Sequence, residues 1–302
     1  AEEGNLTISG TAADTTTTVS SGTGDITLQA QKNLYLTTDA SNNGAVSVST
    51  AGSGSLWLGS TEDDLIMGST ASLSSVDGNQ ILSAGDGTGD ELVIGDLTAT
   101  NADIGLSSVG AIKDADPVTG ADDGQIDVTA QYLSIDAGTF AGASGNRIET
   151  RATTLRALLG DGGLYLQEDD GLTIADGQGQ VAVDKVRINN GALDPLEVKL
   201  FASSGIGSTG PLVLGAAGLV TQSANISAVG NLEVTSTTGA ITMANDAETE
   251  ATGGGGISYT ADGSVALGKL ITGAASGGAT ADPGITVDAG GTITDNRTSS
   301  ST

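Results

Sequence analysis

The sequence contains no cysteine and no histidine. Without cysteine the chain can form no disulfide bond and offers no thiolate as nucleophile or metal ligand. Without histidine it lacks the commonest catalytic base and transition-metal ligand. The two absences exclude a Ser-His-Asp triad, a cysteine nucleophile and an ordinary zinc site.

Aromatic and basic residues are scarce. Aromatic residues make up 2% of the 302 residues, and 10 bases face 37 acids, for a net charge of −27. The core must therefore be built from Val, Ile, Leu and Ala, which suit a narrow interior of stacked layers. The negative surface repels nucleic acid and anionic membranes, so we expect no nucleic-acid partner. No apolar run of about 18 residues is present, so no membrane-spanning helix is expected.

Proline occurs only four times, and we expect each one in a turn or at the start of a strand: Pro117, Pro195, Pro211 and Pro283. Glycine is abundant, with 47 residues, well above the usual share of about 7%. There is no Gly-X-Y repeat, which excludes collagen. An alternation of apolar and polar residues persists between the glycines, which argues against disorder.

Short segments in which an apolar residue alternates with a small polar one recur along the chain, each closed by Gly, Asn or Asp. Examples are Asp25–Leu28, Ala45–Val48, Gln125–Val128, Leu232–Val234 and Ile285–Val287. A long row of similar short strands is the sequence pattern of a solenoid, which is usually a scaffold.

The spacing of the inward apolar residues predicts the size of the repeat. Ile26 and Val46 are 20 residues apart, Val46 and Leu65 are 19 apart, and Val265 and Ile285 are again 20 apart. Two strands with two turns thus take about 16–20 residues, less than the roughly 30 of a βαβ unit. We interpret this length as one coil of a parallel β-helix.

Shorter steps occur at Leu164, Leu172, Val181 and Ile188, which are 8, 9 and 7 residues apart. We interpret them as strands of shorter coils.

An antiparallel meander would give similar spacing, but the turns argue against it. They are longer Gly/Ser/Thr/Asp stretches, such as Gly52–Ser55 and Gly253–Gly256, rather than two-residue Asn-Gly hairpin turns. The one segment with helix-compatible spacing, Arg147–Leu159, begins with a strand-like alternation, so we expect a strand there. The sequence predicts an all-β parallel β-helix with little or no helix, a single elongated domain over 1–302 with a polar tail at 296–302.

Several segments resemble the repeat regions of large secreted bacterial β-helix proteins of the filamentous-haemagglutinin type. They are Gly24–Ala30, Gly163–Leu166, Gly230–Ser236, Gly284–Val287 and Gly291–Asp295. The resemblance implies a right-handed parallel β-helix that is exported to the cell surface as an adhesin or matrix filament. The N-terminal secretion domain of that family is not recognisable, so the chain resembles a shaft segment or a relative that assembles differently.

Carboxylates are the remaining candidates for chemistry. Adjacent acids occur at Asp63–Asp64, Asp122–Asp123 and Asp169–Asp170. Paired carboxylates can hydrolyse glycosides when they lie about 5–10 Å apart across a sugar. Neighbours on a strand point to opposite faces, however, and the aromatic residues that sugar sites use are scattered. We therefore expect no enzyme, and a carbohydrate-active β-helix enzyme is the alternative.

Calcium is the cofactor that the sequence suggests. The segment Asp114–Gly124 carries four carboxylates, those of Asp114, Asp116, Asp122 and Asp123, in one Gly-containing loop. Hard oxygen ligands on a flexible backbone suit Ca²⁺. The loop lacks the ligand order of an EF-hand and has no Glu at the twelfth place. A calcium-dependent binding module is therefore a second alternative, and solvated turn acids are the plain interpretation.

Six of the ten bases lie within residues 147–199: Arg147, Arg151, Arg156, Lys185, Arg187 and Lys199. They either neutralise stacked Asp on the surface or form a charge-complementary contact with an acidic end of another subunit.

We expect a non-enzymatic extracellular structural protein, the shaft of a surface adhesin or a self-assembling filament or sheath subunit. A start at Ala1 without an initiator Met fits a mature secreted chain or an excised fragment equally. The expected partners are further copies, joined end to end or by strand donation, and cell-surface glycans.

Overall fold

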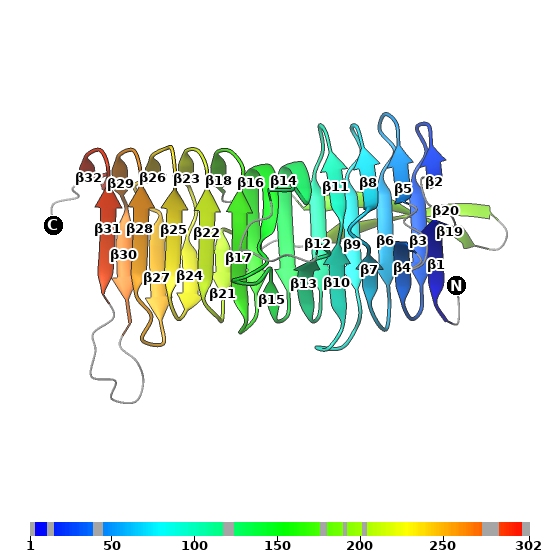
Figure 1. Ribbon diagram of the computed structural model, residues 1–302, viewed down its shortest axis with the longest axis horizontal. Helices are drawn as coiled ribbons and strands as arrows, with labels where there is room; N and C mark the ends of the chain where they lie inside the picture. Colours follow the sequence, from blue (N-terminus) through cyan, green and yellow to red (C-terminus); the bar gives the residue numbers. More distant parts are fainter. Residues whose placement is uncertain are drawn as a thin grey trace.

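Alternating aliphatic and small polar residues build a single long stack of short β-strands. The computed structural model describes residues 4–10, 15–38, 45–116, 124–175, 180–189, 192–200, 204–273 and 284–297. Within these ranges there is no helix, and thirty strands form one sheet that winds along the length of the molecule (Figure 1). The all-β parallel β-solenoid expected from the sequence is confirmed.

Each coil contains three strands, because a strand pairs in parallel with the third strand after it over most of the chain. β1 (Leu6–Gly10) pairs with β4 (Leu34–Thr38), β2 (Thr16–Ser21) with β5 (Ala45–Thr50), and β3 (Ile26–Ala30) with β6 (Leu56–Ser60). The solenoid therefore has three faces, which begin with β1, β2 and β3.

The first face continues from β4 through nine strands: β7 (Leu65–Met67), β10 (Glu91–Ile94), β13 (Ala111–Asp114), β15 (Phe140–Ala141), β17 (Gly163–Glu168), β22 (Leu212–Ala216), β25 (Leu232–Ser236), β28 (Ile257–Ala261) and β31 (Ile285–Ala289).

The second face continues from β5 through β8 (Ala71–Ser75), β11 (Asp96–Ala99), β18 (Leu172–Ile174), β23 (Val220–Gln222), β26 (Ile241–Met243), β29 (Val265–Leu267) and β32 (Ile293–Asp295). The third face continues from β6 through β9 (Gln80–Ala84), β12 (Ile104–Ser108), β21 (Ile206–Ser208), β24 (Ile226–Val229), β27 (Glu248–Thr252) and β30 (Lys269–Thr272).

In the middle of the chain two long strands run through both the second and the third face. β14 (Val128–Ala137) pairs with β11 near its start and with β12 further on, and β16 (Ile148–Leu159) stacks on β14. Within the segment Arg147–Leu159, residues 148–159 thus form a strand, as expected.

The core is a set of aliphatic ladders in register. On the first face Leu34, Leu65, Leu92 and Ile112 follow one another from coil to coil, and each is 0% exposed. Burial of one such side chain contributes about 1.5–3 kcal/mol. Because the side chains alternate along a strand, a slip by one residue would turn the whole ladder outward.

Asn and Asp side chains fix this register at the corners. The Oδ1 atom of Asn33 accepts a hydrogen bond from the Asp64 backbone N–H at 3.2 Å, and Asp64 Oδ1 accepts from Glu91 N at 2.8 Å in the following coil. The same coil-to-coil bond is made by Asn5, Asp25, Asn79, Asp127, Asn225 and Asn231. We call these residues the corner acceptors.

The remaining two strands form an antiparallel hairpin, β19 (Val181–Asn189) and β20 (Ala192–Leu200). It leaves the middle of the solenoid and runs lengthwise over the third face of the first coils (Figure 1). β19 packs against β9, β6 and β3.

Two expectations about the repeat are corrected. The sequence predicted a coil of two strands in about 16–20 residues. That interval separates a strand from the second strand after it, whereas a coil is complete only after three strands, as the pairing of β1 with β4 shows. Val181 and Ile188 belong to the hairpin and not to short coils. The number of residues between two strands shows how far apart they are in the sequence, but it does not show which strands pair with each other.

The hairpin also corrects the expectation about turns and prolines. Asn189 pairs with Ala192, and the two residues between them in the sequence are Asn-Gly, a strong hairpin signal that the expectation of longer turns did not include. Pro195 pairs with Val186 within β20 and not at its start. A two-stranded hairpin tolerates it because each strand has a free edge.

The ladders predict unequal effects of shortening neighbouring side chains on one strand. Leu214 is fully buried and Val213 on the same strand is only half-buried. We expect Leu214→Ala to lower the free energy of unfolding by about 2–5 kcal/mol, and Val213→Ala by less than about 1 kcal/mol. Urea unfolding followed by circular dichroism measures both. Equal losses for the two variants would contradict the inward and outward assignment.

Candidate functional site

The pairing of β16 changes partner in the middle of the strand. Ile148 to Thr150 pair with the end of β17, whereas pairing with β18 begins only at Thr154. Between these two points the backbone of β16 needs another hydrogen-bond acceptor on that side.

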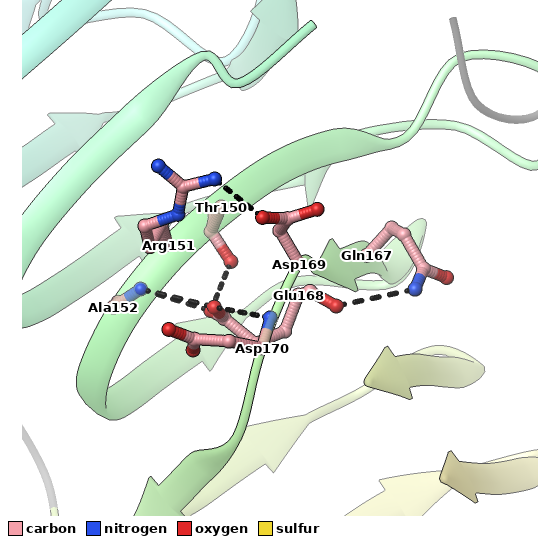
Figure 2. A network of polar contacts seen from close by, with 7 residues as sticks. All are labelled: Thr150, Arg151, Ala152, Gln167, Glu168, Asp169 and Asp170. Atoms are coloured by element: carbon pink, nitrogen blue, oxygen red, sulfur yellow. Dashed lines mark hydrogen bonds and ion pairs between the residues drawn. The ribbon is translucent and has the colours of Figure 1, made fainter. Parts of the chain in front are cut away.

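The side chain of Glu168 supplies this acceptor (Figure 2). Its carboxylate accepts a hydrogen bond from the Ala152 backbone N–H at 3.0 Å and from the Thr150 hydroxyl at 2.7 Å. Glu168 is 0% exposed. Burial is the largest influence on this group and raises its pKa to about 8, although the bonds from Thr150 and Ala152 oppose the shift. Burial therefore favours the protonated form of Glu168.

A second group of carboxylates lies on the preceding coils. Carboxylate oxygens of Asp114, Asp116 and Asp127 all lie within 4.8 Å of one another. Asp127 is a corner acceptor, and its Oδ2 atom accepts a hydrogen bond from the Glu149 backbone N–H at 2.8 Å. Asp114, Asp127 and Glu149 are buried and Asp116 is half-buried. We call Asp114, Asp116, Asp127 and Glu149 the acidic cluster.

Burial and mutual repulsion raise the free energy of the acidic cluster when its carboxylates are ionised. The pKa of Asp127 is raised far above its usual range, first by burial and then by the charge of Asp114. A side-chain hydrogen bond with Glu149 raises it further. The cluster therefore lowers its energy either by holding protons or by binding a cation.

The structure brings together two of the four residues that the sequence suggested for calcium. Asp114 and Asp116 lie in the cluster, and Asp114 Oδ1 also accepts a hydrogen bond from the Asp116 backbone N–H at 2.9 Å. Asp122 and Asp123 lie outside the described residues. Asp127 completes the set.

Sequence reasoning missed Asp127 and Glu149. It placed Asp127 as an outward residue of a strand at 125–128, but β14 begins at Val128, so Asp127 is a buried corner residue instead. The corner pattern of Asn or Asp before a strand was the signal that could have found it.

A pocket of about 340 Å³ opens beside both groups of carboxylates. Gln125, Glu149, Gln167, Glu168 and Asp169 are among its lining residues. Its acidic lining suits a cation or a hydrogen-bond donor more than an anion.

In each of the two acid doublets that the structure describes, one residue takes part in a structural contact. Asp169 forms an ion pair with Arg151 at 2.5 Å (Figure 2), and the carboxylate of Asp64 is a corner acceptor. The carbohydrate-active alternative that used these doublets stays a hypothesis.

The single tryptophan offers no open platform for a sugar. Trp57 on β6 is 6% exposed, because the hairpin covers it and Lys185 lies over its ring, 3.7 Å from the ring centre. Gly59 makes room for the indole, since a Cβ atom at this position would lie 2.4 Å from the ring.

The bases of residues 147–199 serve several roles. Arg151 pairs with Asp169, which fits the neutralisation of stacked acids. Arg156 is buried and lies over the Tyr132 ring, 5.1 Å from its centre. The side chains of Arg187 and Lys199 lie outside the described set.

Comparison with known proteins places the chain in no family. No family model, no curated protein and no solved structure matches it. The described residues include no helix of the length and apolar character required to span a bilayer.

The raised pKa of Glu168 predicts a pH-dependent stability. The unfolded chain releases this proton near its ordinary pKa of 4.5 and the folded chain only near 8. Between these values the folded state binds more protons, so its stability falls as the pH rises. We expect Glu168→Gln, which keeps an oxygen acceptor, to flatten this fall.

Urea unfolding at several pH values between 4.5 and 8.5 measures the effect. Glu233→Gln, at an exposed position on β25, is the control for the loss of one charge. A Glu168→Gln profile that runs parallel to the profile of the unmodified chain would refute the assignment.

Proposed function

We propose that the chain is a non-enzymatic structural β-helix, the shaft of an adhesin or a subunit of a filament that grows by stacking coil on coil. The observation that supports this most directly is the way the ladders end at the last coil. Ile257 and Val265 are 1% and 0% exposed, whereas their register partners Ile285 and Ile293 are 46% and 54% exposed. These inward residues are exposed because no described strand stacks on them.

The first coil presents a matching surface. Leu6, Ile8, Val19 and Leu28 pack against the core but remain only partly buried. A further coil, of the same polypeptide or of another copy, would bury both sets of residues. Parallel strand edges pair readily, so the two surfaces support head-to-tail stacking.

We further propose that the protein acts outside the cell and that cell-surface glycans are additional partners. The resemblance to secreted filamentous-haemagglutinin-type repeats supports this proposal. The net charge of −27 keeps shafts apart sideways.

The stacking proposal predicts rods of uniform width whose length grows with protein concentration and with ionic strength, since salt screens repulsion between acidic copies. A double variant, Ile285→Asp with Ile293→Asp, should stop growth at single units. Leu219→Asp, which changes a 49% exposed residue on the side of the shaft, should not.

Negative-stain electron micrographs and sedimentation velocity read out the lengths. The proposal fails if the unmodified chain sediments as a single unit at every concentration and salt level. It fails equally if the double variant stacks as well as the Leu219→Asp control.

A second candidate function is calcium-dependent stiffening of the shaft at the acidic cluster. Calcium binds oxygen ligands at about 2.3–2.6 Å, so oxygens on opposite sides of one ion lie up to about 5 Å apart. The oxygens of Asp114, Asp116 and Asp127 meet this limit, with mutual distances within 4.8 Å. A cation there would replace the protons that burial otherwise imposes.

Asp127→Asn separates the corner hydrogen bond of Asp127 from its proposed role as a calcium ligand. Asn is used at other corners, as at Asn33, so the corner hydrogen bond should survive. Without calcium we expect the variant to be more stable at neutral pH, on the order of 1–3 kcal/mol, because a buried ionisable group is gone. With calcium the unmodified chain should gain stability and the variant should not.

Thermal unfolding in excess chelator and in millimolar calcium measures both effects, with Asp77→Asn as the surface control. Identical melting temperatures of the unmodified chain with and without calcium would rule out the site.

A further inference from the structure

A specific side-chain contact on each of the first three coils, in addition to apolar packing of β19, holds the hairpin of β19 and β20 to the third face. Asn79, next to β9, donates from Nδ2 to the Ala182 carbonyl oxygen at 2.9 Å. Lys185 lies over Trp57 of β6. The Val186 backbone N–H donates to Thr27 Oγ1 of β3 at 2.8 Å. β19 therefore runs straight along the axis of the solenoid toward its first coil.

The hairpin continues past that coil. Thr27 belongs to β3, the first strand of the third face, yet three further residue pairs follow Val186, from Arg187↔Asp194 to Asn189↔Ala192. Figure 1 shows this end of the hairpin beyond β1 to β3 along the long axis. Three residues of strand span about 10 Å, or about two spacings between strands. We call the three described pairs, residues 187–189 with 192–194, the overhang.

The same face at the other end of the solenoid has no hairpin over it among the described residues. It ends with β27 and β30, whose outward positions include Glu248, Glu250, Lys269 and Ile271. Head-to-tail stacking brings the flank of β27 and β30 next to the first coil of the following copy. The overhang is long enough to reach both strands.

The charge of the hairpin favours this contact. Lys185, Arg187 and Lys199 balance Asp184, Asp194 and Glu197, so residues 181–200 are neutral within a chain of net charge −27. The hairpin is therefore much less repelled than the rest of the surface by the acidic residues of another copy, such as Glu248 and Glu250 of β27.

We propose that the overhang is a strap that lies on the β27–β30 flank of a second copy stacked on the first coil. It repeats between copies the contact that β19 makes with β9, β6 and β3 within one copy. This inference rests on the head-to-tail stacking proposed above. The strap adds a non-covalent contact on the outside of the interface between two stacked copies. This contact fixes the rotation of one copy relative to the next about the long axis.

Disulfide trapping tests the strap directly, because the chain has no cysteine of its own. The double variant Asn189→Cys with Glu250→Cys places one thiol in the overhang and one on β27. These positions lie at opposite ends of the solenoid, so a disulfide between them can form only between copies (Figure 1). Mild oxidation should give a ladder of covalent oligomers on a non-reducing gel.

The matched control pairs Asn189→Cys with Glu233→Cys, which lies on the first face in β25. We expect at least about tenfold less cross-linking from it than from the Glu250→Cys pair. Equal cross-linking of the two pairs, or none from the Glu250→Cys pair in rods that assemble normally, overturns the strap and leaves the stacking proposal intact. Single units without rods in electron micrographs overturn the stacking proposal, and the strap with it.

A shortened hairpin gives a second measurement that does not depend on engineered thiols. Replacing residues 187–194 by an Asn-Gly turn keeps the contacts of Asn79, Trp57 and Thr27 and removes only the overhang. Rods of this variant should break at lower urea concentration than rods of the unmodified chain, while single units unfold alike. Unchanged rod stability would overturn the strap.

Discussion

The structure depends on parallel pairing in register between each strand and the strand one coil later. This pairing aligns identical kinds of residue into ladders, so a chain with almost no aromatic residues still fills its interior with Val, Ile, Leu and Ala. The corner acceptors hold the register, because Asn33 and Asp64 bond the backbone of the following coil where the strands begin. A slip would lose the ladder and the corner bond together, which makes the register cooperative.

The positions of the buried carboxylates in the middle of the chain also follow from the parallel pairing between coils. Where β16 changes partner between Thr150 and Thr154, the sheet needs an acceptor for a backbone N–H, and Glu168 provides it at the cost of a raised pKa. Asp127 is a corner acceptor at the start of the long strand pair β14 and β16, which spans the second and third faces. Protonation of these carboxylates, and the cation binding proposed for the acidic cluster, would therefore be coupled to the stability of the stack.

The parallel β-solenoid was predictable from alternation and glycine-closed turns, but its coil was not. Leu6 and Leu34 stack across 28 residues and Val46 and Ala71 across 25, so turns of unequal length hide the three-strand period. Asp114 and Asp116 were predictable as a cluster because they are close in sequence. Asp127 and Glu149 join it only through pairing between coils. The corner pattern of Asn or Asp before a strand marks Asp127 as a corner residue, but it does not show which carboxylates of the neighbouring coil lie beside it.

Of the corner acceptors, Asp127 alone is buried, at 4% exposure. An uncharged Asn at this position would accept the same hydrogen bond from the Glu149 backbone N–H. Stability alone favours Asn at such a corner, because an amide accepts from the backbone without losing the hydration of a charge. Asn33, Asn79, Asn225 and Asn231 show that the corner geometry accepts it. A carboxylate at the buried corner, with two further Asp oxygens within 4.8 Å, is the arrangement that the proposed cation site requires, whereas the corner hydrogen bond alone does not require it.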